Sequence, residues 1–179
     1  MQPADVIADQ VEWVVLVDDS GRPQGRAPKH LVHHHETPLH LAFSCWVLDG
    51  AGRTLLTRRA LTKRTWPGAW TNTVCGHPAP GEEVASAVRR RAAHELGLPL
   101  RDLELALPTF RYRAVMPDGT VENEICPVFT ASTDAAPTPL ATEVDDLRWV
   151  DVDALVSAVG RDPAPYSPWM LEQIELLFH

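Results

Sequence analysis

An amphipathic helix of about four turns, predicted to end at Leu96, is the feature that most limits how this chain can fold. Its apolar residues recur at every fourth position and share one face: Val84, Val88, Ala92 and Leu96. Gly97 and Pro99 predict where the helix ends. Glu82 and Glu83 are predicted to lie in its first turn, where acids complement the helix dipole.

Most of the remaining chain is predicted to form strands. Apolar and β-branched runs between Gly, Pro and Asp turns predict strands over residues 11–17, 41–48, 53–57, 103–116, 121–131 and 147–150. Two short helices follow, one capped by Asp151 or Asp153 and one with Ser167 at its N-cap. The sequence therefore predicts an α/β (α+β) fold in one domain, residues 1–179, with residues 1–10 as a poorly ordered extension.

Composition limits the classes of partner. The chain has 179 residues, of which 45% are hydrophobic and 22% charged, as in a folded soluble domain. No run approaches the ~20 apolar residues of a membrane span, and no signal peptide is readable, so we expect a cytoplasmic protein without a membrane partner. Three widely spaced cysteines argue against a disulfide framework. A net charge of -8 opposes nucleic-acid binding, so an anionic substrate needs a local basic cluster.

Within residues 69–78, Cys75 and His77 lie on either side of Gly76. On an extended backbone their side chains point to the same face, because side chains alternate along a strand. One interpretation is a nucleophile or acid/base beside a metal ligand. The other is a half-buried cysteine and an ordinary surface histidine. The loop runs directly into the predicted helix, which is a common setting for active sites.

Two further clusters each allow a functional and a structural interpretation. Residues 26–40 hold five of the eight histidines, in either a metal site or a solvated polar loop: His30, His33, His34, His35 and His40. Four basic residues follow the predicted strand 53–57 and form either an anion site or a solvated face: Arg58, Arg59, Lys63 and Arg64.

Glu122 and Glu124 lie two residues apart on a predicted strand and therefore share one face. Adjacent carboxylates repel unless a metal or a shared proton intervenes; the alternative is a solvent-facing acidic strand. If His77 and the His-rich segment adjoin this strand, three imidazoles and two carboxylates can surround one divalent cation. Such ligands suit Mn²⁺, Mg²⁺ or Zn²⁺ without selecting among them.

The loop and the helix resemble a Nudix box, which in that family reads G-x5-E-x7-R-E-U-x-E-E-x-G-U, where U is bulky and aliphatic. The matching positions are Gly76, Glu82, Arg90, Glu95, Gly97 and Leu98. Arg91 and His94 do not match, because Nudix hydrolases place magnesium-binding glutamates there. The resemblance implies a Nudix-like mixed β-sheet sandwiched by helices, without the hydrolases' full carboxylate set.

From about residue 14 to Trp169 the chain is similar to the type I isopentenyl-diphosphate isomerases. The similarity rests on the order and spacing of residues 39–43 (LHLAF), 58–61 (RRAL), 66–68 (WPG), 70–78 (WTNTVCGHP), 110–113 (FRYR), 121–124 (VENE), 126–129 (CPVF) and 167–170 (SPWM). It implies conversion of isopentenyl diphosphate to dimethylallyl diphosphate, by protonation at one alkene carbon and loss of a proton from another. The alternatives are a phosphate-releasing Nudix hydrolase and a catalytically silent metal- or diphosphate-binding module.

The resemblance also implies roles for individual residues. It places the catalytic cysteine at Cys75 and the catalytic glutamate at Glu124, with Tyr112 assisting. The implied metal ligands are His33, His40, His77, Glu122 and Glu124. A register shift of one or two residues would exchange His33 for His34 or His35.

Diphosphate contacts are implied for Lys29, Arg59, Lys63 and Arg91, and Glu95 resembles the acid that holds a second Mg²⁺ with the diphosphate. Trp169 matches the tryptophan that faces the hydrocarbon end. The implied cofactors are a divalent metal at the His3Glu2 site and this second Mg²⁺, with no flavin. The implied partner is a small-molecule prenyl diphosphate, and the protein itself is expected to be a monomer or a weak homodimer.

Overall fold

The computed structural model describes residues 11–179, so the predicted N-terminal extension, residues 1–10, lies outside the described residues. The elements follow in the order β1 (Trp13–Val17), β2 (Pro23–Pro28), α1 (Lys29–Val32), β3 (His40–Leu41), β4 (Phe43–Leu48), β5 (Arg53–Arg59), β6 (Trp70–Thr71), β7 (Val74–Gly76), α2 (Val84–Leu96), β8 (Arg101–Leu107), β9 (Arg111–Val115), β10 (Val121–Ile125), β11 (Val128–Ser132), β12 (Val144–Asp151), α3 (Val152–Arg161) and α4 (Pro168–Leu177). Among the described residues, no helix is long and apolar enough to cross a membrane.

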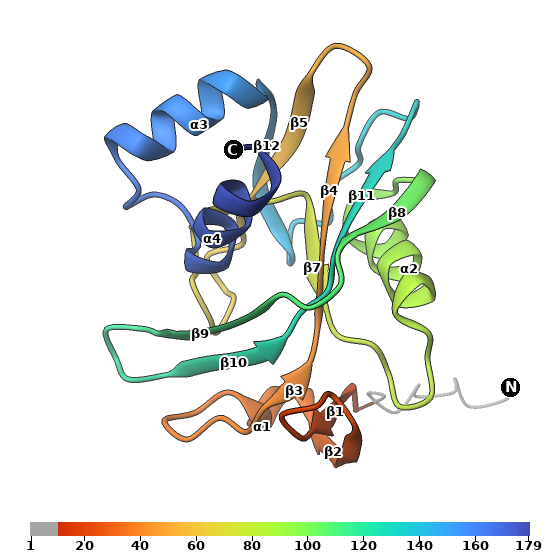
Figure 1. Ribbon diagram of the computed structural model, residues 1–179, viewed down its shortest axis with the longest axis vertical. Helices are drawn as coiled ribbons and strands as arrows, with labels where there is room; N and C mark the ends of the chain where they lie inside the picture. The colour runs from red at the N-terminus through yellow and green to blue at the C-terminus, as the bar shows by residue number, and fades with distance from the viewer. Residues whose placement is uncertain (1–10) are drawn as a thin grey trace, which may run out of the picture.

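Two sheets form the framework of the fold (Figure 1). The first has the strand order β2-β1-β3-β10-β9. The second has the order β12-β5-β4-β11-β8, with β6 paired to β5 and β7 paired to β4. Most pairs are antiparallel, but β3 runs parallel to β10 and β4 runs parallel to β11. Mixed sheets with helices confirm the predicted fold class, with the strands divided between two sheets.

Two neighbouring chain segments pass together from the first sheet to the second. β3 continues into β4 through Ala42, and β10 continues into β11 through Cys126 and Pro127. The Ala42 N–H donates to the Ile125 carbonyl at 2.9 Å, and the Ser44 N–H donates to the Pro127 carbonyl at 3.1 Å. The two segments therefore stay hydrogen-bonded to each other while they change sheets.

Because of this crossing, two of the predicted strands are each divided into two shorter strands. Residues 103–116 were predicted as one strand but form parts of β8 and β9, and residues 121–131 form parts of β10 and β11. In each pair, one strand belongs to each sheet. Pro108 and Pro127 lie at the two breaks, where a residue without an N–H cannot continue a ladder of hydrogen bonds. The short elements β2, β3, β6 and α1 were not predicted.

The helix ends follow the predicted capping residues with one correction. Gly97 ends α2 with a left-handed φ of 60°, which glycine adopts without a steric penalty. Glu83 is the N-cap residue, so Glu82 and Glu83 precede α2 instead of lying in its first turn. Asp151 caps α3 by accepting the Ala154 N–H at 3.0 Å. Ser167 precedes α4 as predicted, but its hydroxyl bonds Thr71 Oγ1 instead of the helix backbone.

Helices cover both faces of the second sheet, and β4 shows how the sequence arranges this. Phe43 and Cys45 belong to the core that includes α2, whereas Trp46 belongs to the core that includes Trp169 and Met170 of α4. This period of two follows from the alternation of side chains along a strand. Ser44 therefore lies on the α4 side of the sheet, where a large cavity opens.

Candidate active site

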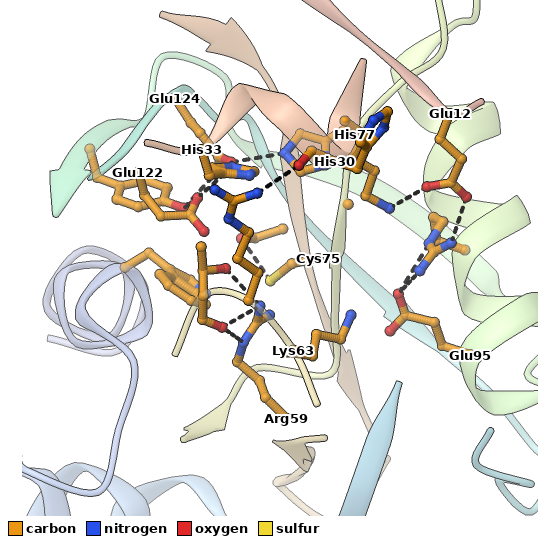
Figure 2. Close-up of a pocket in the computed structure, with 18 of the residues that line it drawn as sticks. Glu12, His30, His33, Arg59, Lys63, Cys75, His77, Glu95, Glu122 and Glu124 are labelled. Carbon is orange, nitrogen blue, oxygen red and sulfur yellow. Dashed lines mark hydrogen bonds and ion pairs between the residues drawn. The ribbon is translucent and has the colours of Figure 1, made fainter. Parts of the chain in front are cut away.

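A cavity of about 720 Å³ lies where residues of both sheets, α2 and α4 come together (Figure 2). It is lined by nearly all residues to which the resemblance assigned a role: Lys29, His33, Arg59, Lys63, Cys75, His77, Arg91, Glu95, Tyr112, Glu122, Glu124 and Trp169. His40 is the exception, because it is completely buried, with its Nε2 atom 3.2 Å from Glu124 Oε1.

Three histidines from separate segments surround the carboxylate of Glu124. His33 follows α1, His40 begins β3 and His77 follows β7, while Glu124 lies on β10 opposite His40. The Glu124 Oε1 atom is 2.9 Å from His77 Nε2 and 3.9 Å from His33 Nε2. One ligand atom from each of the four residues lies within 4.8 Å of the others.

Three ring nitrogens of this cluster are buried without a hydrogen-bond partner among residues 11–179: His33 Nε2, His40 Nε2 and His77 Nδ1. A buried polar atom without a partner is costly, and a bound cation would supply the missing interaction. Imidazole and carboxylate groups are suitable ligands for divalent metals. The four residues therefore form a His3Glu site that can hold a divalent metal. Glu122 Oε2 lies 3.5 Å from His33 Nε2, beside this group and not within it.

The structure separates histidines that are adjacent in the sequence. His33 is buried in the cluster, whereas His34 and His35 are exposed. The His34 ring accepts the Glu36 backbone N–H at 3.1 Å. The metal-site interpretation of the His-rich segment therefore applies to His33 and His40, and the polar-loop interpretation applies to His34 and His35.

The nearby carboxylates act to raise the pKa values of His33 and His77, whereas burial acts to lower them. Burial acts to lower the pKa of His33, but the nearby carboxylates of Glu122 and Glu124 outweigh it and raise this pKa to about 9. Burial lowers the pKa of His77 to about 4, although the hydrogen bond to Glu124 opposes it. A neutral imidazole is the form that binds a metal, so His77 is already in that form at neutral pH.

Tyr112 connects the two carboxylates of β10. Its hydroxyl lies 2.8 Å from Glu124 Oε2 and 3.1 Å from Glu122 Oε2, so its single proton can be donated to either oxygen. Burial and the two negative charges raise the pKa of Tyr112 well above its usual value. Burial acts to raise the pKa of Glu124, but the imidazoles of His33, His40 and His77 around it outweigh burial and hold this pKa well below its usual range. The predicted shared face of Glu122 and Glu124 is thus present, and it is buried and not solvent-facing.

Cys75 faces the cavity from β7, directly opposite Ser44 of β4. Burial raises the pKa of its thiol, against a hydrogen bond from Ser44 and the charge of Arg59. Trp169 of α4 lines the same cavity, with its Nε1–H bonded to Thr71 Oγ1 at 3.0 Å. The ring centroids of Trp169 and Tyr112 are 5.6 Å apart. Thiol, phenol and indole therefore border one space.

Cations line another part of the cavity, and most are paired with carboxylates. Arg91 Nε donates to Glu95 Oε1 at 3.1 Å, and its guanidinium also lies 3.4 Å from Glu143. Lys63 pairs with Glu143 as well. The structure therefore places Glu95 beside Arg91 and does not bring it into the His3Glu group.

Arg59 and Lys29 complete the predicted set of cations. Arg59 donates to the Thr65 carbonyl at 2.8 Å and lies 5.3 Å from the centre of the Trp169 ring. Lys29 pairs with Glu12. In Figure 2 the labelled residues Glu122, Glu124 and His33 lie to the left, Glu12 and Glu95 to the right, and Cys75 between them.

The resemblance did not assign roles to several residues that line the cavity, including Glu12, Ser44 and Arg64. Arg64 belongs to the basic cluster of the sequence, and its Nη1 donates to the His30 carbonyl at 2.7 Å. Arg58 instead pairs with Asp145 on the neighbouring strand. Thus only part of the basic cluster faces the cavity, because adjacent residues of a strand point to opposite sides. No local signal identified Glu12.

Known proteins share this fold. The NUDIX domain family model matches residues 38–173. A protein of known crystal structure from Deinococcus radiodurans aligns with a TM-score of 0.74 over 94% of this chain and all of that chain, at 18% identity. A MutT NUDIX hydrolase from Burkholderia pseudomallei aligns with a TM-score of 0.61 over 78% of this chain and 98% of that chain, at 22% identity. These structures support the fold.

Relatives found by sequence have a much higher identity to this chain than these structures do. An isopentenyl-diphosphate Delta-isomerase from Agromyces mediolanus is 56% identical over 95% of this chain and 82% of its own length. A protein of the same name from Mycolicibacterium vanbaalenii is 56% identical over 94% of this chain and 93% of its own length. The chain therefore belongs to the isopentenyl-diphosphate Delta-isomerases, within the NUDIX domain family.

Proposed function

We propose that this protein interconverts isopentenyl diphosphate and dimethylallyl diphosphate. The observation that carries the proposal is the composition of the cavity: cationic groups at one part, a thiol, and a tyrosine–carboxylate pair beside an aromatic ring. The names of the relatives agree with this activity. The substrate class is accordingly a small-molecule prenyl diphosphate.

The reaction needs an acid and a base on two sides of an alkene. Adding a proton to the terminal alkene carbon leaves a tertiary carbocation, and removing a proton from the neighbouring methylene forms the new double bond. Cys75 on β7 and Glu124 with Tyr112 on the other sheet supply the two proton-transfer groups. Trp169 supplies a π face for the cation, worth ~2 kcal/mol when desolvated. No electron is gained or lost, so the chemistry requires no flavin.

A divalent metal fits the histidine–carboxylate cluster. The proposed ligands are His33, His40, His77, Glu122 and Glu124. When bound, the ion would hold Glu124 in one orientation and withdraw electron density from it, which makes the bonded Tyr112 hydroxyl a better proton donor. The ligand set admits Mn²⁺, Mg²⁺ or Zn²⁺, and elemental analysis of the purified protein identifies which is bound.

The cationic part of the cavity suits the diphosphate. Lys29, Arg59, Lys63 and Arg91 provide the positive charges, and Arg groups can bind phosphate oxygens in a bidentate manner. We propose that Glu95 holds a second Mg²⁺ with the diphosphate. Glu95→Gln is expected to raise the Mg²⁺ concentration needed for half-maximal rate, and Arg59→Ala is expected to raise KM.

The direct test is incubation of the purified protein with isopentenyl diphosphate and Mg²⁺, without flavin or nicotinamide. Proton NMR follows the appearance of the two allylic methyl signals of dimethylallyl diphosphate, and Cys75→Ala serves as the inactive control. Product formation without inorganic phosphate supports the proposal. Phosphate release that persists in Cys75→Ala would indicate a Nudix hydrolase instead, although Arg91 and His94 replace two of the carboxylates that hydrolases use.

A further inference from the structure

A chain of buried polar side chains leads from α4 to the thiol of Cys75. Gln173 lies on the buried face of α4, with 0% of its surface exposed, and the other buried residues of this helix are apolar or aromatic. Its Nε2 donates to Ser44 Oγ at 2.9 Å, and its Oε1 accepts the Trp46 Nε1–H at 2.9 Å. Ser44 Oγ lies 3.5 Å from Cys75 Sγ. A buried polar group in an apolar core requires an explanation, and this chain ends at a reactive atom.

The donor and the acceptor of each hydrogen bond between Trp46, Gln173 and Ser44 can be assigned. An indole N–H can only donate, so it faces the amide oxygen of Gln173, and the amide NH2 must face Ser44. Ser44 Oγ therefore accepts from Gln173, and its own proton remains available for a sulfur. Two sulfurs lie at 3.5 Å, those of Cys75 and Cys126. Only Cys75 lines the cavity.

Asn72 holds the same sulfur from a second direction. Its Nδ2 donates to the carbonyls of Cys45 and Val74 at 3.1 and 3.2 Å, which fixes the orientation of the amide. Its Oδ1 is thereby left as an acceptor, and it accepts the Cys75 S–H at 3.2 Å and the Thr71 O–H at 3.1 Å. The Cys75 sulfur thus lies between Asn72 Oδ1, an acceptor of fixed orientation, and the Ser44 hydroxyl, and these two contacts restrict the rotation of its side chain.

We propose that Ser44, oriented by Gln173, is a positioning residue that keeps the Cys75 sulfur aimed into the cavity during proton transfer. The inference rests on the proposed function, because it assigns Cys75 a role in the reaction. Ser44 and Cys75 are directly opposite each other on β4 and β7, so their side chains are immediate neighbours on one face of the sheet. The role also explains why α4 carries a glutamine among buried Trp169, Met170 and Ile174.

The test compares Ser44→Ala and Gln173→Met with Thr54→Val. Thr54 is also fully buried, and its hydroxyl bonds the Val47 carbonyl, so Thr54→Val removes a buried hydroxyl without touching Cys75. Two readouts are needed: steady-state kinetics with isopentenyl diphosphate, and the rate of Cys75 alkylation by iodoacetamide, read by peptide mass spectrometry. Circular dichroism melts confirm folding of each variant.

We expect Ser44→Ala to lower kcat and slow the alkylation of Cys75 by about tenfold each, with KM changing less than twofold. Gln173→Met should produce a smaller loss of the same kind, and the double variant should be no worse than Ser44→Ala alone, because Gln173 acts through Ser44. Thr54→Val should change neither readout. Gln173→Met also keeps the proposal testable if Ser44→Ala does not fold.

Unchanged kcat and alkylation in both folded variants would overturn the positioning role, as would losses that multiply in the double variant. Failure of the proposed function has a different signature. In that case the parent protein forms no dimethylallyl diphosphate, while alkylation of Cys75 still slows in Ser44→Ala.

Discussion

At the residue scale, four side chains converge on the carboxylate of Glu124. Its Oε1 faces the imidazoles of His33, His40 and His77, and its Oε2 accepts the Tyr112 O–H at 2.8 Å. The two oxygens therefore have different partners, one suited to a metal and one suited to a proton. This division would allow one carboxylate to take both of the roles proposed for it.

We expect Glu124→Gln to lower kcat by more than ~10²-fold, the lower range for loss of a positioned acid or base. The amide has the same shape but cannot carry the proton, and its NH2 must face either the histidines or the Tyr112 hydroxyl. Isomerisation kinetics at fixed Mg²⁺ measure the effect, and the exposed Glu36→Gln is the control. Activity within threefold of the parent would remove Glu124 from the mechanism.

A second prediction at this scale is that His33, and not the nearby His35, binds the metal. His33→Ala is expected to lower the metal content of dialysed protein, because it removes one of the buried nitrogens that lack another partner. His35→Ala is the matched control, since that ring is exposed. Inductively coupled plasma mass spectrometry measures the stoichiometry. Equal loss in both variants would contradict the assignment of His33.

At the element scale, the approach of α2 to β7 decides where the cations lie. An added Cβ at Gly76 would stand 2.9 Å from Phe43 Cζ and 3.0 Å from Arg91 Cγ, closer than carbon atoms pack. Gly76 thus allows the helix to bring Arg91 and Glu95 to the edge of the cavity. The glycine of the Nudix-like motif has a packing role here that its sequence position alone does not reveal.

We therefore expect Gly76→Ala to raise KM for isopentenyl diphosphate, because Arg91 must move, and to destabilise the fold by about 1–3 kcal/mol. Gly50→Ala is the control, since an added Cβ there meets nothing within 4 Å. Kinetics and thermal melts of the two variants provide the comparison. A normal KM in a destabilised Gly76→Ala would show that Arg91 does not contact the substrate.

At the scale of the whole molecule, an acidic chain concentrates cations in one cavity and pairs them with carboxylates. Glu143, in the loop before β12, pairs with Lys63 and lies 3.4 Å from Arg91 of α2. Burial acts to raise the pKa of Glu143, but Lys63 and Arg91 outweigh it, so this pKa lies below its usual value. These ion pairs connect the loop before β12 with α2 and with Lys63, which are distant from it in the sequence.

This shift predicts how stability depends on pH. A lowered pKa in the folded state means that the ionised Glu143 stabilises the fold above about pH 4.5, and that this contribution is lost as the pH falls through the folded-state pKa. Glu143→Gln should therefore be less stable than the parent at pH 7, and the difference should close toward pH 3. Thermal melts across this range, with Glu36→Gln as control, measure it. A difference that stays constant to pH 3 would refute the ion pairs.

The sequence by itself determined the local features of this protein. The period of four in α2 and its glycine end depend on neighbouring residues only, and they were predicted correctly except that Glu82 and Glu83 precede the helix. The sequence left Asp151 and Asp153 as alternative caps of α3, and the structure shows Asp151 in that role. The residue types of the site were also readable, because thiol, imidazole and carboxylate groups imply particular chemistry wherever they stand. The order and spacing of the motifs indicated the family, because both can be read from the sequence without knowing the fold.

Only the tertiary structure decided which residues meet. Strand signals on both sides of Pro108 and Pro127 look alike, so the division between two sheets depends on pairing with segments far away in the chain. His33 and His34 have the same side-chain chemistry, so only their different burial in the folded protein identifies His33 as the candidate metal ligand. Gln173 reaches Ser44 across 129 positions of sequence, and no local pattern specifies such a contact, because it depends on how α4 packs on the sheet.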